Sequence, residues 1–183
     1  MSVLRVPVNS RDHIKGPANA PVELVEYGDY QCPYCGAAHP VVKFLQDRYR
    51  HSMRFVFRHF PLTEIHPMAA PAAEAAEYAA DYGRFWEMHD AIYENQQRLS
   101  IPVLFQLAGA LGLSQIGLRD SIAQMRHADK IQADFIGGVR SGVNGTPTFF
   151  INDVRFDGDW SDAAAFIAVL KQAGRAPPAS RRP

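Results

Sequence analysis

Hydrophobic and polar positions predict a strand, a helix and a second strand in the first third of the chain. Residues 21–30, PVELVEYGDY, form a short, mostly apolar run that ends at a turn. From Cys32 to Tyr49 the apolar positions recur at helical spacing, with Pro40 inside the helix, where it should bend it. Residues 52–60, SMRFVFRHF, alternate again and predict a second strand. A right-handed crossover would lay these two strands parallel.

The middle of the chain has a helical period. From His66 to Gly142, apolar residues recur at three- and four-residue spacing, with breaks at Gly83, residues 100–102 and residues 112–114. Ser114 is placed to act as an N-cap after the last of these breaks. This region predicts a block of helices.

The pattern returns to strands after the helical block. Residues 148–151 and 154–156 predict two short strands joined by a tight turn. A final helix is expected at about Asp162–Ala173, with Ser161 as its cap. We therefore predict an α/β chain with a strand, helix, strand half and a strand, strand, helix half, separated by an all-helical insertion.

Composition narrows the class of protein. The 183 residues are 47% hydrophobic, which suits one domain with a full core or a core domain with an insertion. With 19 basic and 19 acidic residues and no charge run, no nucleic-acid partner is expected. The first residues lack the apolar segment of a secretory signal, and no stretch is long enough for a membrane span. We expect a cytoplasmic protein, or a periplasmic one if a leader was removed; the alanine-rich, lysine-poor composition is typical of a bacterium.

The chain has two cysteines, Cys32 and Cys35, at the predicted strand-to-helix junction. A disulfide between them would close too small a loop to staple the fold, so redox or metal chemistry must explain the pair. A thiol at a helix N-terminus is stabilised as the thiolate by the unpaired backbone N–H groups and the helix dipole. The sequence therefore predicts that Cys32 is the nucleophile and that Cys35, one turn further in, is the resolving thiol.

A metal site at this pair is the less favoured reading. Tetrahedral zinc needs four ligands, and His39 supplies a third at most. No metal is therefore expected at the cysteines. His89, within the apolar run FWEMH, reads as a core residue, and His59 and His66 as structural.

Two further residues are candidates for the same site. Glu26 lies six positions before Cys32 on the predicted strand and is proposed as the proton acceptor for Cys35; the alternative is an ordinary exposed strand glutamate. Pro147 precedes the first strand of the predicted hairpin. Its peptide bond is either cis, which would turn the strand toward a neighbouring loop, or trans, as in an edge strand; periodicity does not decide between them.

These motifs resemble those of the thioredoxin superfamily, and within it the DsbA-like thiol-disulfide oxidoreductases. The resemblance rests on CPYC at a strand-to-helix corner, Glu26, Pro40, the helical insertion and GTP before the hairpin, and it spans about residues 17–174. It implies a thioredoxin-like fold, with βαβ and ββα halves around a mixed sheet.

The resemblance also assigns substrate-contacting residues. It implies that Pro147 is cis and faces the cysteines, that the backbone of Thr146 pairs with an extended substrate segment, and that Pro33 and Tyr34 tune the redox potential. Strongly oxidising members carry a histidine where this chain has Tyr34, which predicts a less acidic Cys32 and a weaker oxidant. The implied partners are protein thiols and disulfides, or glutathione mixed disulfides. No cofactor is required, and a monomer is expected.

The predicted domain boundaries follow the change of period. The thioredoxin-like part comprises residues 17–60 and 143–174, and the helical insertion residues 61–142. An N-terminal segment covers residues 1–16, and residues 175–183 form a tail expected to be disordered. Two other functions stay open: a glutathione-dependent transferase or isomerase of the same superfamily, and a redox-sensing peptide-binding module.

Overall fold

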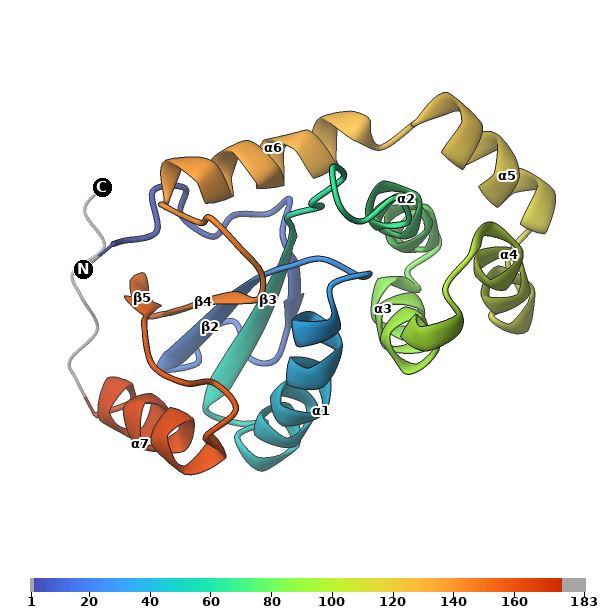
Figure 1. Cartoon of the computed structure of the whole chain (residues 1–183). Coiled ribbons are helices and arrows are strands. Elements are labelled where there is room, and N and C mark those ends of the chain that lie inside the picture. The colour runs from blue at the N-terminus through green and yellow to red at the C-terminus, as the bar shows by residue number, and fades with distance from the viewer. Residues whose placement is uncertain (1, 176–183) are drawn as a thin grey trace.

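The computed structural model describes residues 2–175, which form a five-stranded mixed sheet with helices on both faces (Figure 1). The strands lie in the order β1-β3-β2-β4-β5. The elements along the chain are β1 (His13–Lys15), β2 (Val22–Gly28), α1 (Pro33–Arg48), β3 (Met53–His59), α2 (Ala69–Ala80), α3 (Phe85–Glu94), the 3-10 turn η1 (Gln96–Arg98), α4 (Ile101–Ala110), α5 (Gln115–Gln124), α6 (Ala128–Arg140), β4 (Thr148–Ile151), β5 (Val154–Phe156) and α7 (Ala163–Ala173).

The sheet has the two halves that the sequence predicts. Strands β2 and β3 are parallel and joined by α1, whereas β2 pairs antiparallel with β4 and β4 with β5. The β4–β5 turn lies at Asn152 and Asp153, both of which have positive φ, as a tight hairpin turn requires. The expected thioredoxin-like α/β fold with a helical insertion is therefore confirmed.

Alternating side chains of β2 face two different cores. Val22 and Leu24 belong to the larger core, which packs under α1, α7 and the insertion, whereas Val25 and Tyr27 belong to the smaller core beneath α6. Figure 1 shows α6 crossing the face of the sheet opposite α1 and α7. Because the period is two, Glu26 lies on the α1 face, the side that carries the cysteines.

The insertion consists of helices α2 to α6 between β3 and β4. Ser114 caps α5 as predicted, its hydroxyl oxygen accepting the Gly117 N–H at 3.0 Å. The predicted cap of α7 is wrong by one residue: Asp162, not Ser161, accepts the N–H groups of Ala164 and Ala165. A carboxylate reaches both N–H groups, while the Ser161 hydroxyl bonds Asp159 instead.

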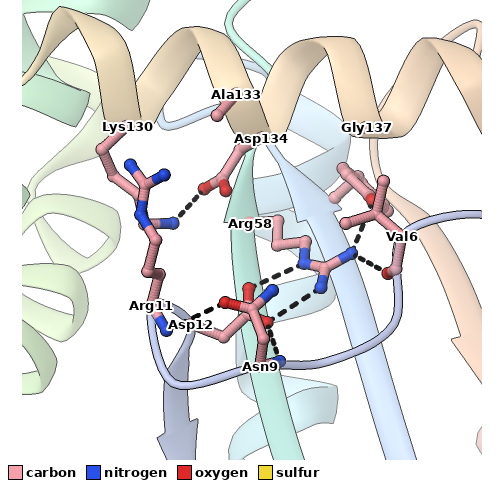
Figure 2. Close-up of a pocket in the computed structure, with 10 residues that line it drawn as sticks. Val6, Asn9, Arg11, Asp12, Arg58, Lys130, Ala133, Asp134 and Gly137 are labelled. Atoms are coloured by element: carbon pink, nitrogen blue, oxygen red, sulfur yellow. Dashed lines mark hydrogen bonds and ion pairs between the residues drawn. The ribbon is translucent and has the colours of Figure 1, made fainter. Parts of the chain in front are cut away.

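The N-terminal segment is part of the folded unit. The pattern predicts no strand before residue 21, yet β1 pairs antiparallel with β3. The buried Arg58 guanidinium holds the segment in place: it forms two hydrogen bonds with the Asp12 carboxylate, each 2.8 Å, and donates to the Val6 carbonyl (Figure 2). It also donates to the Pro7 carbonyl. A three-residue strand carries too short an alternation to be recognised from sequence.

Among the described residues, no helix has both the length and the apolar character needed to cross a membrane. The tail predicted to be disordered falls outside the described residues, except for Arg175.

Candidate active site

Cys32 occupies the N-cap position of α1, with Pro33 as the first helical residue. The missing N–H of proline costs nothing there, because the first N–H groups of a helix have no intrahelical partner. No side-chain oxygen caps this helix and no acidic residue lies in its first turn. The thiol therefore meets the positive end of the helix with no carboxylate capping the first helical N–H groups.

The surroundings of Cys32 favour its thiolate. A hydrogen bond from Cys35 lowers the pKa of Cys32 to about 5, assisted by the Thr146 hydroxyl and the N–H groups of Cys35 and Tyr34. These bonds outweigh two features that favour the thiol: the residue is only 3% exposed, and the protonated Sγ donates to the carbonyl oxygen of Thr146 at 3.3 Å. The Thr146 hydroxyl is buried and has no hydrogen-bond partner among the described residues, so it is free to bond the Cys32 thiolate. At neutral pH this thiol is a nucleophile.

Cys35 lies one helical turn inside and is fully buried. Its sulfur accepts the backbone N–H of Asp29 at 3.4 Å. Burial raises the pKa of Cys35 well above its usual range, and its hydrogen bond to Cys32 and the negative charge of Glu26 act in the same direction. Both thiols are free, so the structure is that of the reduced dithiol.

Glu26 is buried on β2, which excludes the alternative of an ordinary exposed strand glutamate. Burial raises the pKa of its carboxyl to about 8, and the charge of the Cys32 thiolate adds to this effect. A carboxyl with this pKa exchanges protons readily near neutrality, and it acts electrostatically on both cysteines.

The Thr146–Pro147 peptide bond is cis and precedes β4. The loop places the Thr146 carbonyl against Cys32, although the two residues are 114 positions apart. Pro33 and Tyr34 are exposed beside the thiol. The predicted site residues are thus brought together around one corner of the sheet.

Asp29 is a residue of the corner that the sequence did not indicate. Its buried carboxylate accepts the backbone N–H of Gln31 at 2.8 Å, of Cys32 at 3.3 Å and of Leu62 at 2.9 Å. It also bonds Nδ1 of His66 at 2.8 Å. Asp29 therefore shapes the turn that presents Cys32 and connects it to the loop after β3, which gives His66 the structural role expected of it.

Gln96 is the second such residue, and it comes from the helical insertion. Its side-chain Nε2 donates to the carbonyl oxygens of Tyr30 and Cys32, both at 2.9 Å. Gly36 lies directly beneath it: a Cβ at Gly36 would come within 2.1 Å of Gln96 Oε1. The insertion is thereby attached to the turn that carries Cys32, through hydrogen bonds between residues that lie about 65 positions apart in sequence.

The histidines near the corner do not form a metal site together with the cysteines. His89 is buried among aromatic rings and bonds the Tyr30 hydroxyl, as expected of a core residue. Among the described residues, two groups of three side chains could hold a metal ion, and neither includes Cys32 or Cys35. His39 belongs to one of them with His89 and Asp90.

Comparisons with known proteins place the chain in a family. It matches the family model described as Thioredoxin over residues 9–171. Among solved structures, BdbD from Bacillus subtilis superposes with a TM-score of 0.85 at 21% identity, covering 96% of this chain and 99% of that one. The α-DsbA1 protein of Wolbachia pipientis superposes with a TM-score of 0.81 at 22% identity, covering 93% and 94%. At these identities the likeness shows the fold.

The curated relatives are longer proteins. The chain is 46% identical over 168 residues to the Na(+)/H(+) antiporter NhaA 3 of Salinispora tropica, which covers 91% of this chain and 26% of the antiporter. It is 38% identical over 166 residues to the antiporter NhaA of Nitrosospira multiformis, with 89% and 26% covered. The chain thus spans about a quarter of the length of these relatives. The family match, the CxxC corner and the superpositions together establish that the chain belongs to the thioredoxin family and has the fold of its DsbA-like thiol-disulfide oxidoreductases.

Proposed function

We propose that the protein is a thiol-disulfide oxidoreductase that cycles Cys32 and Cys35 between dithiol and disulfide. The observation that carries the proposal is the unequal pair at the start of α1: the pKa of Cys32 is lowered to about 5 by the hydrogen bond from Cys35, and burial raises the pKa of Cys35 well above its usual range. A thiol with a low pKa is present as the thiolate at neutral pH, where it attacks a disulfide and also leaves readily. The buried thiol of Cys35 reacts only once a mixed disulfide has formed at Cys32.

The reaction needs no cofactor, and its electrons balance within the protein and substrate. The Cys32 thiolate attacks a substrate disulfide, forming a mixed disulfide and releasing one substrate thiolate. Cys35 then transfers its proton to the ionised form of Glu26 and attacks Cys32 Sγ, which releases the second substrate thiolate and leaves a Cys32–Cys35 disulfide. The substrate gains two electrons and the dithiol loses two; the reverse sequence oxidises a substrate dithiol.

The loop at Thr146 supports an extended protein segment as substrate. The Thr146 carbonyl accepts the S–H of protonated Cys32. A thiolate or a disulfide cannot donate this bond, so the carbonyl is free for a substrate N–H once Cys32 has ionised. The exposed Tyr34 and Pro33 would border such a segment.

The curated relatives favour a second candidate, a redox-sensing module. Proteins named as Na(+)/H(+) antiporters contain a region 46% and 38% identical to this chain. In that reading the dithiol reports on the redox state and switches a partner rather than turning over substrate. The intact CxxC pair argues against a glutathione transferase, since activation of glutathione does not need two thiols.

The deciding experiment measures the reduction potential of the Cys32–Cys35 pair and the turnover of a peptide disulfide. The reduction potential is measured in glutathione buffers by alkylation and intact mass, on a scale from about −270 mV for thioredoxin to about −120 mV for DsbA. A value near the lower end indicates a reductase and one near the upper end an oxidant. Multiple turnovers of a peptide disulfide support the enzyme, whereas a single oxidation without turnover favours the sensor. If no disulfide forms at any glutathione ratio, both readings fail.

A further inference from the structure

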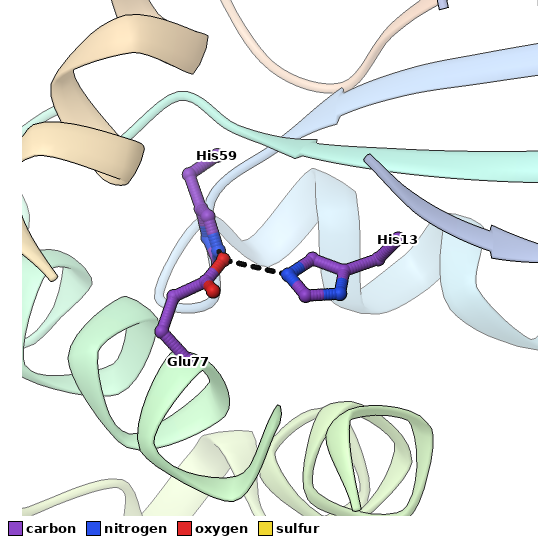
Figure 3. Close-up of side chains that lie close together, drawn as sticks. All are labelled: His13, His59 and Glu77. Atoms are coloured by element: carbon purple, nitrogen blue, oxygen red, sulfur yellow. Dashed lines mark hydrogen bonds and ion pairs between the residues drawn. The ribbon is translucent and has the colours of Figure 1, made fainter. Parts of the chain in front are cut away.

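Three side chains from separate elements meet behind the active corner: His13 on β1, His59 at the end of β3 and Glu77 on α2. Figure 3 shows His13 and His59 converging on the Glu77 carboxylate. Both Nε2 atoms contact the same oxygen, Glu77 Oε1, at 2.8 Å from His13 and 2.7 Å from His59. The three donor atoms lie within 4.8 Å of one another.

Within residues 2–175, the Glu77 carboxylate forms no ion pair with lysine or arginine, and its side chain is 6% exposed. Glu77 Oε1 is within hydrogen-bond distance of both imidazole Nε2 atoms. A buried carboxylate needs a compensating positive charge, which a bound cation would supply.

We propose that His13, His59 and Glu77 bind a divalent transition-metal ion of the Zn²⁺ class. Two imidazoles and one carboxylate, completed by water, are an established zinc ligand set. Ligand atoms around tetrahedral zinc lie roughly 3.3 Å apart, given bonds of about 2.0–2.1 Å, so each imidazole nitrogen needs to move only about 0.5–0.6 Å away from Glu77 Oε1. Glu77 Oε2 has no hydrogen-bond partner among the described residues and is free to turn toward the ion.

The site can be reached from solvent, and an ion bound there would connect three elements of the fold. The His13 side chain is 16% exposed on the edge strand, while that of His59 is 1% exposed. A bound ion would join the edge strand, the central part of the sheet and the first helix of the insertion. Because His59 Nδ1 is buried and has no partner among the described residues, we expect affinity about 10–100-fold below that of a site with a complete outer shell.

The other group of potential ligands lacks the feature that favours binding. His39, His89 and Asp90 also lie within reach of one ion. There Lys43 pairs with Asp90 and already supplies the positive charge, and His89 Nδ1 bonds the Tyr30 hydroxyl. This group therefore serves as the matched control.

The test uses the oxidised protein, in which the Cys32–Cys35 disulfide leaves no thiolate to bind zinc. Calorimetric titration with Zn²⁺ should give one ion per chain, and Co²⁺ should produce the absorption bands of a tetrahedral N/O site. Glu77→Gln and His13→Asn should each weaken Zn²⁺ binding at least tenfold, whereas His39→Asn should leave it unchanged. Zn²⁺ should also raise the thermal midpoint of the wild type but not of Glu77→Gln.

Two results would overturn the proposal: no Zn²⁺ uptake by the oxidised wild type, or unchanged affinity in a folded His13→Asn variant. His13 lies on the edge strand, so this variant keeps the test decisive if Glu77→Gln does not fold. Neither result bears on the exchange reaction at Cys32, which is assayed separately.

Discussion

The N-termini of α1 and α7 offer the same two backbone N–H groups to different partners. At α7, Asp162 accepts the N–H groups of the residues two and three positions on, Ala164 and Ala165. At α1, the N–H groups in the equivalent positions, of Tyr34 and Cys35, act on the sulfur of Cys32 and lower its pKa. At α7 the N–H groups are bonded by the exposed carboxylate of Asp162. At α1 they stabilise the negative charge of the Cys32 thiolate, which forms and disappears in the proposed exchange reaction.

The largest effect should come from replacing the sulfur at α1. Cys32→Ser keeps an N-cap atom but removes the nucleophile, so turnover of a peptide disulfide should fall at least about a thousandfold. The circular dichroism spectrum should stay that of the wild type. Asp162→Ser is the matched change at α7 and should leave turnover unaltered; comparable activity of Cys32→Ser and wild type would end the nucleophile assignment.

The next largest effect should come from Glu26, the acidic residue near the start of α1, which contrasts with Asp162 at the start of α7. At α7 the carboxylate is exposed, whereas Glu26 near α1 is buried with a pKa of about 8. Between about pH 4.5 and 8 the unfolded chain releases this proton and the folded chain retains it, so Glu26 lowers the stability of the reduced protein as the pH rises. Glu26→Gln should therefore raise the free energy of unfolding at pH 8 by on the order of 3 kcal/mol and change it little at pH 4.

Denaturant unfolding of the reduced proteins at both pH values measures this difference. Glu26→Gln should also slow the step in which Cys35 resolves a mixed disulfide, while the first attack by Cys32 stays fast. An unchanged pH dependence of resolution would remove Glu26 as proton acceptor.

A smaller effect isolates the hydrogen bond from Cys35. Since this bond is the largest cause of the low pKa of Cys32, Cys35→Ala should raise that pKa from about 5. Each unit of increase lowers the thiolate fraction about tenfold at pH values below the pKa. The rate of iodoacetamide alkylation between pH 4 and 9 reports it. Cys35→Ser retains a donor and should shift the midpoint less; equal midpoints in both variants and wild type would contradict the assignment.

The smallest effect is at α7 itself. Asp162→Ala should lower the free energy of unfolding by about 1 kcal/mol, because two N–H groups lose their acceptor. Ser161→Ala, at the position that the sequence pattern favours, should change it by less than about 0.5 kcal/mol. Chemical denaturation of the oxidised proteins distinguishes them, and the reverse order would restore Ser161 as the cap.

Local patterns were sufficient to predict the elements whose signals are continuous in sequence. The apolar run of β2, the alternation of β3 and the helical spacing after Cys32 all correspond to observed elements. The two cysteines, Glu26 and Thr146 were found because motifs or the family resemblance mark them. Their pKa shifts could not be predicted, since these depend on burial by the whole sheet.

Residues that act through distant contacts gave no sequence signal. Gln96 reaches Cys32 across 64 positions, and Glu77 reaches His13 across the same separation. Neither residue lies in a pattern that distinguishes it from a surface glutamine or glutamate. Only the packing of the insertion against the sheet brings them to their partners, and a single sequence does not encode that packing in any local period.

The covering of β5 has a consequence for aggregation. Residues 2–4 run along this outermost strand: Val3 forms a bridge with Val154, the Leu4 N–H donates to the Asp153 carbonyl, and the Arg155 N–H donates to the Ser2 carbonyl. Unpaired edge strands are templates on which other chains assemble. At the opposite edge, β1 is only three residues long. The described part of the protein thus exposes little sheet edge on which another chain could assemble.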